Sequence, residues 1–182
     1  MKRYQVTELL QLAKKVYPML NNCNITIKET NEFSCIVKEN DTYIVTYTNA
    51  PSFKHDYYFK NICSYLQDKF KFKDGVKMVK EFEMIFSFLH ELGHIVNMNK
   101  VVDESVYYSN FKTAVYTSQR QAFNTYREIP TESLADASAI EIMSKCNVEI
   151  YSMFNNMSIA EAKEEIKFWN EFWYKLIKKF DR

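Results

Sequence analysis

The stretch Phe82–Val96, FEMIFSFLHELGHIV, is apolar almost all round, which is typical of a buried helix. At about 100° per residue, its polar side chains share one sector of about 100°. The members of this stripe are Glu83, Ser87, His90, Glu91 and His94. A buried helix with one narrow polar stripe is expected to turn that stripe toward a polar cleft. We therefore expect a helix over residues 76–98 whose polar face carries the chemistry.

A metal-binding pattern lies within this stripe. The run His90-Glu91-Leu92-Gly93-His94 matches H-E-x-x-H. Residues four apart on a helix lie on the same face, with about 5–6 Å between their Cβ atoms, so both imidazoles can converge on one Zn²⁺. Glu91 lies beside them and can reach a water at the metal without being a ligand. The alternatives are a buried helix whose histidines bond to core groups and a metal site without catalysis.

The third ligand is expected to be a carboxylate, because the remaining histidine, His55, precedes the motif. Glu132 and Asp136 form E-x-x-x-D on a predicted helix, and we assign Glu132 as the ligand. Asp136, one turn further on, would accept a hydrogen bond from His90 and fix its tautomer. Two alternatives stay open: Glu128 as the ligand, or two carboxylates placed there only because acidic residues favour helix N-termini.

The two motifs together resemble those of the gluzincin-type zincins, and most closely the ImmA/IrrE family of bacterial and phage metallopeptidases. That family carries HELGH and then E-x-x-A-[ND]-x-x-A on a later helix, and residues 132–139 of this chain match the second pattern. The resemblance covers roughly residues 76–145, and the length of the chain predicts a single zincin-like metallopeptidase domain over residues 1–182. The resemblance also implies a protein substrate, with a DNA-binding repressor as one possibility.

The motifs predict a zinc-dependent endopeptidase, intracellular and regulatory. Zn²⁺ held by His90, His94 and Glu132 would lower the pKa of its water toward about 7. Glu91 would act as general base and then return the proton to the leaving amine. A further side chain is expected to steady the oxyanion. The candidates lie between the two metal-binding helices: Tyr107, Tyr108, Tyr116, Arg120, Tyr126 and Arg127. The alternatives are a non-catalytic interaction protein on a zincin scaffold and a metal-dependent amidase acting on the cell wall.

The rest of the chain predicts an α+β, zincin-like fold. We expect a small antiparallel three-stranded sheet, with several helices packed around the buried HExxH helix. The expected strands are 25–29, 33–38 and 42–48. The segment 106–116 is expected to be strand or loop. The other expected helices are 7–17 with Thr7 as its cap, 54–70, 117–127, 131–145 and one that follows a capping box of Ser158 and Glu161 and ends near residue 180.

The composition excludes several classes of protein. Two glycines among 182 residues cannot build a P-loop or a Rossmann fingerprint. A net charge of +1 gives no basic footprint for direct nucleic-acid binding. No apolar run approaches the roughly 20 residues of a membrane span, and the N-terminus lacks the apolar core of a signal peptide. The four cysteines contain no C-x-x-C pair. We therefore expect a cytoplasmic protein with reduced thiols and no membrane partner.

The placement of the two glycines is informative. Gly75 precedes the HExxH helix and is expected to form its turn or cap. Gly93 lies in the middle of that helix, where glycine costs about 1 kcal/mol relative to alanine. Since the chain otherwise avoids glycine and Gly93 flanks the histidine face, we expect its missing side chain to let a neighbouring segment or the substrate approach closely there and reach the metal.

Overall fold

A computed structural model describes residues 1–31, 34–48, 65, 81–100 and 103–180, with side chains through residue 171. Within these ranges the protein is α+β, with seven α-helices, one short 3-10 helix and one three-stranded sheet. In chain order the elements are α1 (Arg3–Val16), η1 (Pro18–Asn22), β1 (Asn24–Thr30), β2 (Ile36–Glu39), β3 (Thr42–Thr48), α3 (Phe82–Asn97), α4 (Ser105–Val115), α5 (Gln119–Glu128), α6 (Pro130–Lys145), α7 (Asn147–Asn155) and α8 (Ile159–Phe180). The predictions for 54–70 with His55, for Gly75 and for residues 76–80 lie outside the described residues.

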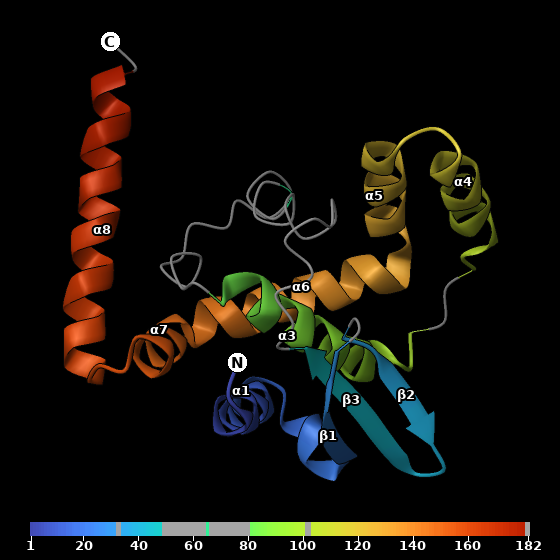
Figure 1. Cartoon of the computed structure of the whole chain (residues 1–182), viewed down its shortest axis with the longest axis horizontal. Helices are drawn as coiled ribbons and strands as arrows, with labels where there is room; N and C mark the ends of the chain where they lie inside the picture. The colour runs from blue at the N-terminus through green and yellow to red at the C-terminus, as the bar shows by residue number, and fades with distance from the viewer. Residues whose placement is uncertain (32–33, 49–64, 66–80, 101–102, 181–182) are drawn as a thin grey trace.

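Helix α3 is the centre of the fold. It lies between the sheet and α6, and α1 packs against both helices (Figure 1). Phe86, Phe88, Leu89, His90 and Glu91 point in different directions around α3, and all are buried. The prediction of a buried helix is therefore confirmed, and its polar stripe has to find polar partners inside the protein.

The sheet is mixed, so the prediction of an antiparallel three-stranded sheet, with the strands paired in chain order as a meander, is wrong. The order is β1-β3-β2: β2 pairs antiparallel with β3 through a tight turn at Asn40, and β1 pairs parallel with β3. β3 is the most apolar strand, with Val45 and Tyr47 fully buried, whereas Val37 of β2 is 47% exposed. A meander would place β2 in the centre and leave the apolar β3 at an edge with unpaired backbone groups. Burial of β3 therefore decides the order.

Two helices differ from expectation, α1 in where it begins and α4 in being a helix at all. α1 begins at Arg3, and the Gln5 side chain accepts a hydrogen bond from the Lys2 amide at 2.8 Å. Thr7 is therefore inside the helix, where its hydroxyl donates to the Arg3 carbonyl. The segment predicted as strand or loop is helix α4, and the Asp103 carboxylate accepts from the Ser105 amide at its start.

The remaining helices follow the predictions closely. α5 and α6 match the expected 117–127 and 131–145 within a few residues. At α8 the predicted capping box is confirmed, since the Ser158 amide donates to Glu161 and the Glu161 amide donates to the Ser158 hydroxyl. The short α7 was not predicted. α4 and α5 form a hairpin beyond one end of α6, and α8 extends from α7 beyond the other (Figure 1). None of the helices described is long and apolar enough to cross a membrane.

Gly93 is the point of closest approach between α3 and α6. A Cβ atom there would lie 2.6 Å from the Ala135 carbonyl oxygen and 2.8 Å from the Ala135 Cα. One turn further on, the Asn97 amide bonds to the Gly93 carbonyl at 2.8 Å and to the Ser138 hydroxyl at 2.9 Å. The expected close approach is therefore confirmed, and the approaching segment is α6.

Gly93→Ala should destabilise the protein even though alanine is the better helix former. The added methyl group meets backbone atoms of Ala135, so the two helices must move apart, and such overpacking typically costs about 1–3 kcal/mol. Urea unfolding monitored by circular dichroism measures the change. Ser144→Ala, at an exposed position of α6, is the matched control and should leave stability unchanged or slightly raised. A Gly93→Ala protein as stable as the unmodified chain would contradict the close contact.

Candidate metal centre

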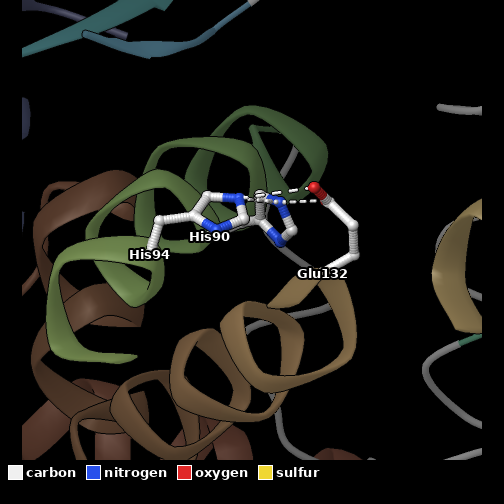
Figure 2. A group of neighbouring side chains, drawn as sticks. All are labelled: His90, His94 and Glu132. Atoms are coloured by element: carbon white, nitrogen blue, oxygen red, sulfur yellow. Dashed lines mark hydrogen bonds and ion pairs between the residues drawn. The ribbon is translucent and has the colours of Figure 1, made fainter. Parts of the chain in front are cut away.

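Helices α3 and α6 bring three potential metal ligands together. Figure 2 shows His90 and His94 on α3 facing Glu132 at the start of α6. Nε2 of His90 lies 3.1 Å from Oε2 of Glu132 and 3.2 Å from Nε2 of His94. Nε2 of His94 lies 3.8 Å from Oε1 of Glu132. One ligand atom from each residue lies within 4.8 Å of the others.

These separations fit a tetrahedral zinc site. Zinc binds nitrogen and oxygen ligands at about 2.0–2.2 Å, so neighbouring ligand atoms around a tetrahedral ion lie about 3.3 Å apart. Two imidazoles and one carboxylate are also the donor set of many catalytic zinc sites. Both the distances and the donor chemistry of His90, His94 and Glu132 therefore suit this ion.

The hydrogen-bonding groups of His90 and Glu132 also favour a positive charge between them. Nδ1 of His90 lies 2.9 Å from Oδ1 of Asp136, so this nitrogen carries a proton and donates it. In the neutral ring Nε2 is then an acceptor, and it points at the Glu132 carboxylate, which is an acceptor too. Two acceptors at 3.1 Å need a proton or a metal cation between them.

The shifted pKa values of His90, His94 and Glu132 also indicate that a positive charge is favoured here. Burial lowers the pKa of His90, but its hydrogen bonds to Asp136 and Glu132 outweigh burial and raise the pKa to about 9. Burial raises the pKa of Glu132, but the bond from His90 and the charge of both histidines lower it below its usual range. Burial and the positive charge of His90 lower the pKa of His94. Without a metal ion, protonated His90 therefore supplies the positive charge beside Glu132.

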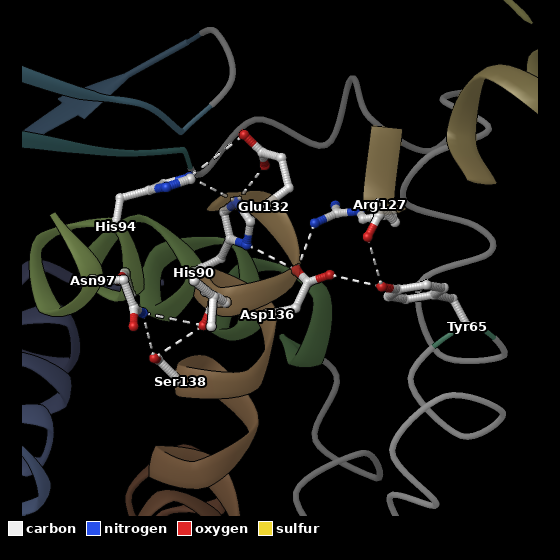
Figure 3. Close-up of polar contacts among 10 residues, drawn as sticks. Tyr65, His90, His94, Asn97, Arg127, Glu132, Asp136 and Ser138 are labelled. Carbon is white, nitrogen blue, oxygen red and sulfur yellow. Dashed lines mark hydrogen bonds and ion pairs between the residues drawn. The ribbon is translucent and has the colours of Figure 1, made fainter. Parts of the chain in front are cut away.

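Asp136 occupies the position predicted for it. It is fully buried, and its Oδ1 accepts from Nδ1 of His90. The same oxygen accepts from Nη1 of Arg127 at 2.7 Å, and Oδ2 accepts from the Tyr65 hydroxyl at 3.0 Å (Figure 3). The predicted contact between Asp136 and His90 is therefore present, with two additional donors.

Glu91 lies on α3 between the two histidines in sequence, and it is nearly fully buried. Burial raises the pKa of its carboxyl to about 7, and the negative charge of Glu132 contributes to the increase. The charges of His90 and Arg127 oppose the increase. A carboxyl with a pKa in this range can both accept and release a proton near neutral pH.

The six oxyanion candidates separate into two groups. The hydroxyl of Tyr126 is hydrogen-bonded to Glu132, and burial together with that carboxylate raises its pKa. Arg127 is paired with Asp136. The other four have exposed side chains on or just beyond α4 and α5: Tyr107, Tyr108, Tyr116 and Arg120. The oxyanion role stays a prediction, with Tyr126 the candidate that contacts one of the three potential metal ligands, Glu132.

Sequence reasoning missed three polar residues that support the site. Tyr65 bonds to Asp136, and Asn97 and Ser138 link α3 to α6 (Figure 3). Tyr65 is one of 13 tyrosines and carries no spacing signal. Asn97 did carry a spacing signal, because it follows Gly93 by four residues and so lies on the same face of α3. The reserve ligand Glu128 is exposed at the end of α5.

Comparisons of the chain with protein-family models, with curated proteins and with solved structures found no match. The relationship to the ImmA/IrrE family therefore stays a prediction, and the candidate metal centre rests on its own geometry.

Proposed function

We propose that this protein is a zinc-dependent endopeptidase. The observation that carries the proposal is the convergence of His90, His94 and Glu132, with Glu91 next to the first histidine on the same helix. The two histidines and Glu132 would hold the ion. When bound, zinc supplies Lewis acidity, which polarises a carbonyl oxygen and makes a water acidic enough to attack near neutral pH.

Three residues around the proposed ion have separate roles, in proton transfer and in orienting the ligands. Glu91 takes the proton of the attacking water and delivers it to the leaving amine, a role that its buried carboxyl and its place beside the ligands suit. Asp136 holds the His90 ring so that its Nε2 faces Glu132 and His94. Tyr126 orients the Glu132 carboxylate through a hydrogen bond. The predicted cytoplasmic location would place the protein substrate inside the cell.

Glu91 distinguishes this function from its alternatives. A purely structural zinc site needs its ligands and has no use for an extra buried carboxyl, which is costly to bury. A non-catalytic interaction protein on the same scaffold would therefore be expected to lose it. A cell-wall amidase would use the same residues, so the substrate assay separates it from an endopeptidase.

Glu132→Ala should reduce zinc binding by more than the roughly 10- to 100-fold that loss of an outer partner costs. The reason is that a ligand, and the negative charge that offsets the ion, both disappear. Elemental analysis and competition with a chromophoric chelator measure stoichiometry and affinity. Glu128→Ala is the matched variant and should bind zinc as the unmodified chain does. If Glu128→Ala lost the ion and Glu132→Ala kept it, the ligand assignment would be reversed.

Glu91→Gln should keep zinc but lose at least about 100-fold in the rate of peptide hydrolysis, since general-base catalysis contributes about 10²–10⁴-fold. Glutamine keeps the shape of the side chain and cannot take up the proton. Release of fluorescent peptides from labelled casein measures the rate, and purified peptidoglycan tests the amidase alternative. Glu8→Gln, exposed on α1, is the control. Equal activity of Glu91→Gln and the unmodified chain would refute the role of Glu91, and cleavage of peptidoglycan alone would favour the amidase.

A further inference from the structure

Arg127 lies in the last turn of α5 with only 12% of its side chain exposed. Its guanidinium carbon lies 5.5–6.0 Å from the centroids of four aromatic rings. The rings, which we call the aromatic cage, are those of Tyr65, Phe86, Phe123 and Tyr126. Ring faces attract a cation, but a guanidinium removed from water also needs a hydrogen-bond acceptor.

That acceptor is the carboxylate that holds a metal-binding histidine. Nη1 of Arg127 and Nδ1 of His90 bond to the same Asp136 oxygen, at 2.7 and 2.9 Å. The Tyr65 hydroxyl bonds to the other oxygen, and the same hydroxyl lies 3.5 Å from the Arg127 carbonyl. Figure 3 shows the chain of contacts from Arg127 through Asp136 to His90 and Glu132.

Asp136 depends on this partner. Its side chain is fully buried, and a buried carboxylate that loses its cationic partner is strongly destabilised. Without Arg127, Asp136 would keep its hydrogen bonds from His90 and Tyr65 but lose the fixed positive charge beside it, and its carboxylate would be drawn toward water. The His90 ring, which takes its orientation from that oxygen, would then no longer point Nε2 at Glu132 and His94.

We infer that Arg127 is a positioning residue of the metal centre: the aromatic cage holds its guanidinium, the guanidinium holds Asp136, and Asp136 orients His90 for the ion. The inference rests on the proposed zinc site. It also gives α5 a function, because Tyr126 and Arg127 on successive positions of this helix reach Glu132 and Asp136, respectively.

The test is a double-mutant cycle read out as affinity for Zn²⁺ in the full-length chain. Arg127→Met should weaken binding by about 10- to 100-fold, the usual effect of losing an outer partner of a ligand. Arg127→Lys keeps the charge but not the planar fork, and should recover part of the loss. In an Asp136→Asn background, Arg127→Met should change affinity less than threefold, because the residue through which it acts carries no charge. Arg3→Met, exposed on α1, is the control for loss of an arginine.

A second readout uses Co²⁺ in place of zinc, since its visible absorption reports the ligand geometry. Arg127→Met should alter that spectrum, and Arg3→Met should not. If the unmodified chain bound no zinc, the proposed function itself would fail. If it bound zinc and Arg127→Met bound equally tightly, or lost the same factor with and without Asp136→Asn, the inference would be overturned. Should Arg127→Met fail to fold, the cycle is run with Arg127→Lys, whose smaller loss must likewise vanish in the Asp136→Asn background.

Discussion

The close contact between α3 and α6 at Gly93 is the constraint on which the rest of the structure depends. Backbone atoms of Ala135 lie where a side chain at position 93 would be. At this separation His90 and His94 reach across to Glu132, and His90 reaches Asp136 one turn further along α6. The polar bonds of Asn97 hold the same pair of helices on the other side of the contact. A wider helix pair would leave each of these groups buried without its partner, which the interior does not tolerate.

Much of the site could be predicted because it depends on local spacing. His90 and His94 are one turn apart, as are Glu132 and Asp136, and each pair therefore shares a helix face. The pairing of His90 with Asp136 follows once the two faces meet. Gly93 indicated a close contact of the helix with another part of the protein. The chain has only two glycines, and one of them lies in the middle of a helix, where it is unfavourable unless packing is close. Periodicity likewise predicted α3, α5 and α6.

The features that were missed depend on contacts distant in sequence. Strand order followed from which strand was buried, and an alternating pattern does not show whether β3 is central or at an edge. The segment 106–116, which is rich in the strand formers Val, Tyr and Thr, was predicted to be strand or loop, but it is helix α4, which packs on α5 through Phe111 and Tyr126, whose ring centroids lie 5.5 Å apart. Tertiary packing overrode propensity there. Tyr65 contacts Asp136 from 71 residues away, and no sequence spacing predicts such a contact.

The charge balance explains why the site suits a divalent cation. Among the described residues, three buried carboxylates surround the histidines, those of Glu91, Glu132 and Asp136, and Arg127 supplies one compensating positive charge. Three negative charges and one positive charge leave two negative charges, which one divalent ion neutralises. A proton on His90 offsets one of them, and a proton on Glu91, whose pKa burial raises to about 7, would offset the other but leave Glu91 neutral. A bound divalent ion would neutralise both charges while Glu91 stays ionised, the form that the proposed catalysis needs, and it would stabilise the folded protein by binding to it.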